Sequence, residues 1–179
     1  MNVRKRLYFL LPAALAALIQ HTIHELTHFL AARGLGEVVS EFRFLTNGMF
    51  TSQVIFATPI AERAGLHWLV IAWSPALVTI MIGYLLYLFR DRWLTEVRPL
   101  NAALWFATAY FLLVDPLYLA LLAPFFGGGD AGAVEAVGWP QWPVHVVAGA
   151  VLVVNGWLVY RMRQEANLEP GRYLAPEAQ

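Results

Sequence analysis

Two histidines and a glutamate lie within an apolar segment near the start of the chain. His24 and His28 are four positions apart, and Glu25 follows the first of them. If the segment is helical, both imidazoles lie on one face and can bind one metal ion, typically zinc. The glutamate of such a His-Glu-x-x-His pattern can act as general base on a zinc-bound water. Because ionisable groups are costly in an apolar span, we interpret these residues as functional.

A hydrolytic zinc site usually has three protein ligands, so a third ligand must come from another segment. Two aspartates can supply it. Asp115 lies inside a later apolar span, and the helix rise places it at about the depth of His24. Asp130 follows the glycines of 127–129, which allow the backbone a close approach to other elements. The residues alone leave both aspartates open as the third ligand.

The same histidine segment has an alternative interpretation. His24, Glu25 and His28 could form a buried polar network that holds helices together.

His21 lies one turn before His24, and we expect it to support a ligand or to line the site. A fourth histidine ligand would close the metal to water, so we do not expect His21 to bind the metal.

The composition is that of a membrane protein. Of 179 residues, 59% are hydrophobic and 13% are charged, whereas soluble domains average about 25% charged residues. The net charge is zero, which argues against a nucleic-acid-binding protein. The chain has no cysteine, so any metal must be bound by histidine, carboxylate, carbonyl or water. Lipid is therefore an expected partner, and nucleic acid is not.

The apolar segments predict an all-α polytopic membrane protein with about four transmembrane helices. They cover residues 7–32, 66–89, 100–123 and 143–160, each near the ~20 residues that cross a bilayer. We expect a single membrane domain over residues 1–163 and a flexible polar tail over 164–179.

The loop after the first helix predicts a β-hairpin within residues 37–58. Residues 38–44 and 50–56 have strand-forming composition, and Asn47-Gly48 between them is a strong hairpin turn signal. A two-stranded hairpin is only marginally stable alone, so it should lie against the membrane part. An extended peptide could then add to its edge as a further strand.

Basic residues predict the orientation of the chain. They precede the first span, lie between the second and third, and follow the fourth: Arg4, Lys5, Arg6, Arg90, Arg92, Arg98, Arg161, Arg163 and Arg172. The positive-inside rule then places both termini in the cytoplasm. We expect an integral protein of the plasma membrane.

The motifs together resemble the site-2 protease family of intramembrane zinc metalloproteases, in its compact branch without accessory domains. The resemblance rests first on His24-Glu25-Leu26-Thr27-His28, on residues 29–36 that follow it, and on the hairpin. Two later segments also support it: Trp73-Ser74-Pro75-Ala76 and Gly129-Asp130-Ala131-Gly132-Ala133-Val134. It implies Zn²⁺ bound by His24, His28 and Asp130, Glu25 as the catalytic base, and hydrolysis of peptide bonds in membrane-protein or peptide substrates. Ala131 departs from the family, which has glycine after the aspartate.

Other functions are also compatible with the sequence. A non-catalytic membrane zinc protein could use the same site as a regulatory or chaperone-like partner. Glu25 and His28 also form a Glu-x-x-His pair of the kind that di-iron bundles use, but the chain has no second such pair. The absence of an internal repeat argues against a transporter.

Overall fold

The computed structural model describes residues 3–46, 51–126 and 129–165, and it is mostly helical. The first half contains α1 (Val3–Gly34), β1 (Val39–Thr46), β2 (Thr51–Phe56), η1 (Ile60–Glu62), α2 (Leu66–Leu88) and α3 (Arg90–Trp93). The second half contains α4 (Arg98–Leu117), the π-helical η2 (Tyr118–Leu122), α5 (Ala123–Phe126), α6 (Gly129–Gly132), η3 (Ala133–Val137) and α7 (Trp142–Glu165).

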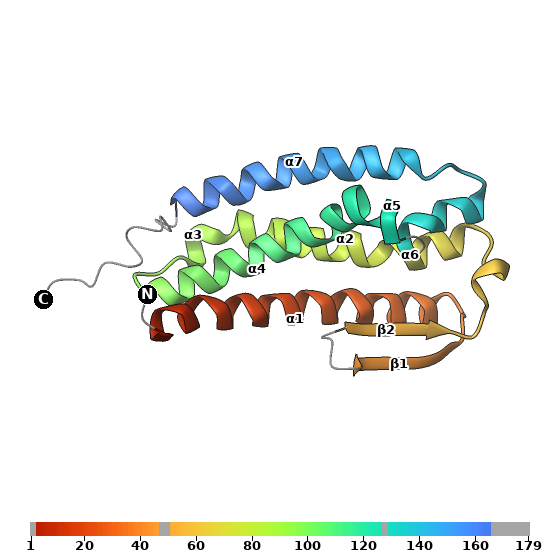
Figure 1. Cartoon of the computed structure of the whole chain (residues 1–179), viewed down its shortest axis with the longest axis horizontal. Coiled ribbons are helices and arrows are strands. Elements are labelled where there is room, and N and C mark those ends of the chain that lie inside the picture. The colour runs from red at the N-terminus through yellow and green to blue at the C-terminus, as the bar shows by residue number, and fades with distance from the viewer. Residues whose placement is uncertain (1–2, 47–50, 127–128, 166–179) are drawn as a thin grey trace, which may run out of the picture.

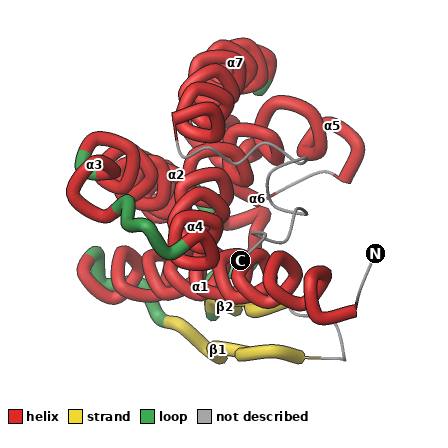
Figure 2. The backbone as a smooth tube through the Cα atoms, turned by 90° about the vertical axis from the view of Figure 1, so that its left-hand side faces the viewer, coloured by secondary structure: helices red, strands yellow, loops and turns green. Residues whose placement is uncertain are grey.

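The long helices α1, α2, α4 and α7 run side by side (Figure 1). Helix α4 is central, because it packs against α1, α2 and α7. Helices α1 and α7 lie on opposite sides of the bundle, and the hairpin covers the second half of α1 from outside (Figures 1 and 2). The start of α1 and the end of α7 lie at the same end of the bundle.

The prediction of four spans is confirmed in part. In the described part of the chain, three segments are long and apolar enough to cross a membrane: Leu66–Leu88, Pro99–Phe125 and Trp142–Glu165. Helix α1 is continuous over 32 residues, but it is not among these three. The second half of α1 contains the polar residues Gln20, His21, His24, Glu25 and His28.

Helix α1 ends in a Schellman motif that turns the chain back toward the hairpin. Gly36 adopts a φ of +82°, a conformation that favours glycine. The N–H of Glu37 donates to the carbonyl of Ala32 at 2.9 Å, and the N–H of Gly36 donates to that of Arg33 at 3.3 Å. These bonds satisfy carbonyls that the helix end leaves free. The following strand therefore runs back along α1.

The predicted hairpin is confirmed. Strands β1 and β2 pair antiparallel, with Phe42 opposite Val54. Val54 is buried, and aromatic contacts join the hairpin to α1 and α2, such as Phe29 with Phe42 and Phe56 with Trp68. The predicted turn at Asn47-Gly48, the glycines 127–128 and tail residues 166–179 lie outside the described residues.

Close packing of α2 on α4 depends on Gly83. A Cβ at this position would lie 2.7 Å from Leu112 Cδ2 and 3.0 Å from the backbone nitrogen of Leu112. Glycine therefore lets the two backbones approach. Next to this contact, the buried residues Tyr87, Leu112, Val159 and Met162 form one hydrophobic core between α2, α4 and α7.

Pro116 in α4 leaves a buried carbonyl without its helical donor, and α7 supplies a replacement. Proline has no N–H, so the carbonyl four residues earlier, that of Leu112, loses its intrahelical bond. The Asn155 side chain donates Nδ2–H to this oxygen at 2.7 Å. Tyr84 of α2 donates its hydroxyl to Asn155 Oδ1 at 2.8 Å. One fully buried amide thus links α2, α4 and α7.

Candidate metal centre

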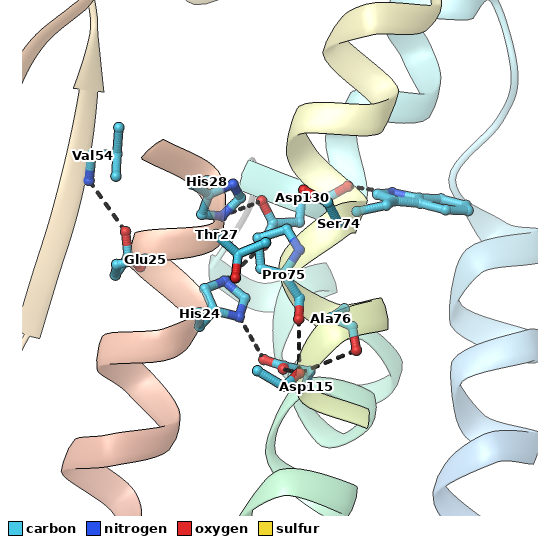
Figure 3. Close-up of polar contacts among 12 residues, drawn as sticks. His24, Glu25, Thr27, His28, Val54, Ser74, Pro75, Ala76, Asp115 and Asp130 are labelled. Atoms are coloured by element: carbon cyan, nitrogen blue, oxygen red, sulfur yellow. Dashed lines mark hydrogen bonds and ion pairs between the residues drawn. The ribbon is translucent and has the colours of Figure 1, made fainter. Parts of the chain in front are cut away.

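His24, His28 and Asp130 converge between α1 and α6, and could together hold a metal ion (Figure 3). His24 Nε2 lies 3.4 Å from Asp130 Oδ2, and His28 Nε2 lies 3.3 Å from Asp130 Oδ1. One ligand atom from each residue can be chosen so that all three lie within 4.8 Å of one another. The structure therefore brings together the three residues that the sequence predicted as ligands.

These separations suit a shared ion. Two ligand atoms bound to zinc at about 2.0–2.1 Å with a tetrahedral angle lie about 3.3 Å apart. The two nitrogen–oxygen distances of 3.4 and 3.3 Å match this value, and both exceed the usual ~2.7–2.9 Å of a charge-assisted hydrogen bond. The donor set, two imidazoles and one carboxylate without sulfur, is one that zinc accepts.

The opposite nitrogen of each imidazole faces an acceptor. His24 Nδ1 lies 3.0 Å from Asp115 Oδ1. The angle of this contact does not meet the geometry of a hydrogen bond, and His24 Nδ1 has no other hydrogen-bond partner among the described atoms. His28 Nδ1 donates to the carbonyl of Ile71 at 2.9 Å. With the proton on Nδ1, each Nε2 presents a lone pair to the Asp130 carboxylate. The lone pairs of the two Nε2 atoms and the carboxylate oxygens repel one another. A metal ion between them, or a proton on Nε2, is needed to make the contact favourable.

Asp115, the other predicted candidate for the third ligand, occupies a different place. It is buried, and its Oδ2 accepts from Gln20 Nε2 at 3.2 Å and from the hydroxyl of Thr79. Its other oxygen faces the side of the His24 ring that points away from Asp130. A carboxylate behind a metal-binding histidine orients the ring and fixes its tautomer. The geometry therefore favours Asp130 as the third ligand and Asp115 as the support of His24.

Three features place Asp130. Gly129 has a φ of +61°, which positions the aspartate at the start of α6. Ala131 is only 1% exposed and anchors the turn. Trp73 of α2 donates Nε1–H to the backbone carbonyl of Asp130 at 2.9 Å. The alanine that departs from the family pattern therefore fits a buried position.

Glu25 points to the opposite side of α1 from Asp130, toward the hairpin (Figure 3). Its Oε2 accepts from the backbone N–H of Val54 in β2 at 3.2 Å. Because the outer edge of a strand carries N–H groups that its neighbour does not use, this carboxylate occupies a position where another strand could pair. The proposed catalytic base is thus held by the edge of β2, on the side of α1 away from Asp130.

His67 and His145 have partners outside the candidate metal site. His67 Nε2 pairs with Glu37 Oε1 at 3.0 Å near the base of the hairpin. His145 Nδ1 donates to the carbonyl of Leu119 at 2.6 Å. The supporting role predicted for His21 remains a prediction. Over the described ranges, one group of metal-binding side chains is found, so the second site that a di-iron centre requires is not found there.

Comparison of the chain with protein-family models, with curated proteins and with solved structures found no match. The resemblance to site-2 proteases therefore stays a prediction from the motifs of the sequence.

Proposed function

We propose that this chain is a membrane-embedded zinc metalloprotease of the site-2 protease type, which cleaves peptide bonds of membrane-spanning substrates. The supporting observation is the convergence of His24 and His28 Nε2 on Asp130 at zinc-ligand spacing, with Glu25 at the next helical position. The basic residues favour both termini in the cytoplasm, and the proposed location is the plasma membrane. The common end of α1 and α7 fits this orientation.

The chain's own residues have distinct roles in this reaction. Zinc, when bound, would polarise the substrate carbonyl and lower the pKa of a water toward ~7. Glu25 takes a proton from the attacking water as its oxygen bonds to the carbonyl carbon. It then gives this proton to the leaving nitrogen as the carbon–nitrogen bond breaks. Asp115 and the Ile71 carbonyl keep the two imidazoles oriented throughout.

The strand edge suits an extended substrate. A membrane helix hides its peptide bonds in its own hydrogen bonds, so a substrate must first be locally unwound. The Val54 N–H points toward Glu25, and a substrate carbonyl paired with β2 could accept from it instead. Such pairing would also free the Glu25 carboxylate, which must turn from the hairpin toward the metal site to act as base.

Hydrolysis of fluorescein-labelled casein, an unfolded chain, tests the proposal. Purified protein loaded with zinc should release labelled fragments, and Glu25→Gln should reduce the rate by at least about a hundredfold, the usual contribution of a general base. Its zinc content should stay unchanged, and Glu62→Gln, on an exposed glutamate, should cleave normally. Cleavage by Glu25→Gln at the normal rate would refute the assigned mechanism.

A non-catalytic membrane zinc protein is the second candidate. The bond from Val54 to Glu25 favours it, because a structural role for the carboxylate would be to hold the hairpin against α1. This candidate predicts that zinc-loaded protein does not cleave casein. It also predicts that Glu25→Gln, whose amide oxygen can still accept from Val54, changes neither zinc content nor stability.

A further inference from the structure

Pro75 lies in the middle of α2, one turn after a carbonyl that faces the metal centre. Because proline has no N–H, the carbonyl of Ile71, four residues earlier, has no intrahelical donor. Ile71 is only 1% exposed, so bulk water cannot replace that donor. A buried carbonyl of this kind needs a partner from elsewhere.

His28 of the neighbouring helix provides this partner. Its Nδ1–H donates to Ile71 O at 2.9 Å, whereas the hydroxyl of Ser74 approaches the same oxygen only to 3.3 Å. Donation from Nδ1 leaves Nε2 without a proton, which is the form of imidazole that binds a metal. The same bond aims Nε2 at Asp130, 3.3 Å away.

At two other prolines in the bundle, a side chain also donates to the carbonyl that lacks a helical donor. Asn155 caps the Leu112 carbonyl that Pro116 leaves free. In η2 the N–H of Ala123 donates to Tyr118 O, five residues earlier. By the same spacing Pro124 would pair with Leu119 O, and His145 takes this oxygen instead. In these three cases a side chain of an adjacent helix binds the carbonyl that proline leaves free.

We propose that Pro75 is a positioning residue of the metal centre. By leaving the Ile71 carbonyl without a helical donor, it fixes His28 with a proton on Nδ1 and with Nε2 directed at Asp130. This inference rests on the metal site of the proposed function but not on protease activity. The proline thus acts on the metal through His28, without contact to the metal.

Pro75→Ala tests this role with zinc alone as the probe. The restored N–H of residue 75 can take the Ile71 carbonyl, so His28 loses its fixed acceptor. Zinc affinity, measured by competition with a chromogenic chelator, should fall about 10–100-fold, the usual effect of losing such a supporting bond. Pro12→Ala makes the same chemical change within α1, away from the metal centre, and should leave zinc affinity unchanged.

Nitrogen NMR of ¹⁵N-histidine-labelled, metal-free protein gives a readout that a merely structural proline would not move. His28, assigned by comparison with His28→Gln, should carry its proton on Nδ1 in the wild type. Pro75→Ala should shift its resonances toward the other tautomer. A wild-type ring protonated on Nε2, or a Pro75→Ala protein with unchanged tautomer and zinc affinity, would overturn the inference. Absence of zinc binding by the wild type would instead refute the metal site, whichever tautomer is found.

Discussion

Replacement of Asn155 by leucine should destabilise the fold by an amount that depends on Pro116. The amide is fully buried, donates to Leu112 O at 2.7 Å and accepts from Tyr84 at 2.8 Å. Leucine leaves the buried Leu112 carbonyl and the half-buried Tyr84 hydroxyl without partners. A buried polar group without a partner costs about 1–3 kcal/mol, and the half-buried Tyr84 hydroxyl should cost about 1 kcal/mol. Asn155→Leu should therefore lower the free energy of unfolding by about 2–4 kcal/mol.

In a Pro116→Ala background the loss should be smaller. The alanine N–H can donate to Leu112 O along the helix, so Asn155→Leu then leaves only the Tyr84 hydroxyl without a partner. We expect the cost to fall by about 1–3 kcal/mol, the share of the Leu112 carbonyl. The assay is unfolding by sodium dodecyl sulfate in mixed micelles, applied to all four metal-free proteins of the cycle. Equal costs in both backgrounds would refute the idea that Asn155 replaces the amide that proline lacks.

Two further predictions concern the helix contact and the hairpin. Gly83→Ala should lower the free energy of unfolding by about 1–3 kcal/mol through overpacking. Gly149 is the control, because an added Cβ there would meet no atom within 4 Å, and it should tolerate alanine. Similar losses at both positions would contradict the packing argument. Glu25→Ala should speed hydrogen exchange of the Val54 amide about tenfold, and Glu41→Ala should not. Labelling with carbonyl-¹³C glutamine and ¹⁵N valine makes the signal of this amide unique, because the sequence has a single Gln–Val pair. Unchanged exchange in Glu25→Ala would show that the carboxylate does not hold the strand.

Much of the metal centre could be predicted from side-chain spacing. A four-residue separation on a helix puts His24 and His28 on one face wherever the helix lies. The turn signal and strand composition likewise predicted a hairpin that the structure confirms. The helix rise placed Asp115 at the depth of His24, and the two side chains are in contact. Depth alone cannot tell which ring nitrogen an aspartate faces, so the choice between Asp115 and Asp130 needed coordinates.

The support of His28 was not predicted. Its partner is a backbone oxygen of Ile71, and a backbone acceptor leaves no trace in residue types. The available signal was Pro75 in an apolar helix, because proline always removes one helical donor. The contact of Glu25 with Val54 was missed for the same reason, since it joins a side chain to a backbone N–H. Three of the four predicted spans are confirmed over the described residues, and the span in α1 stays a prediction.

Zinc X-ray absorption of the purified protein, combined with elemental analysis, is the most direct test that His24, His28 and Asp130 hold a metal ion. We predict about one zinc per chain with only nitrogen and oxygen ligands, including two imidazoles. His24→Ala should abolish this signal, and His67→Ala, on a histidine paired with Glu37, should retain it. A protein that binds no zinc, or one whose zinc survives His24→Ala, would contradict the account.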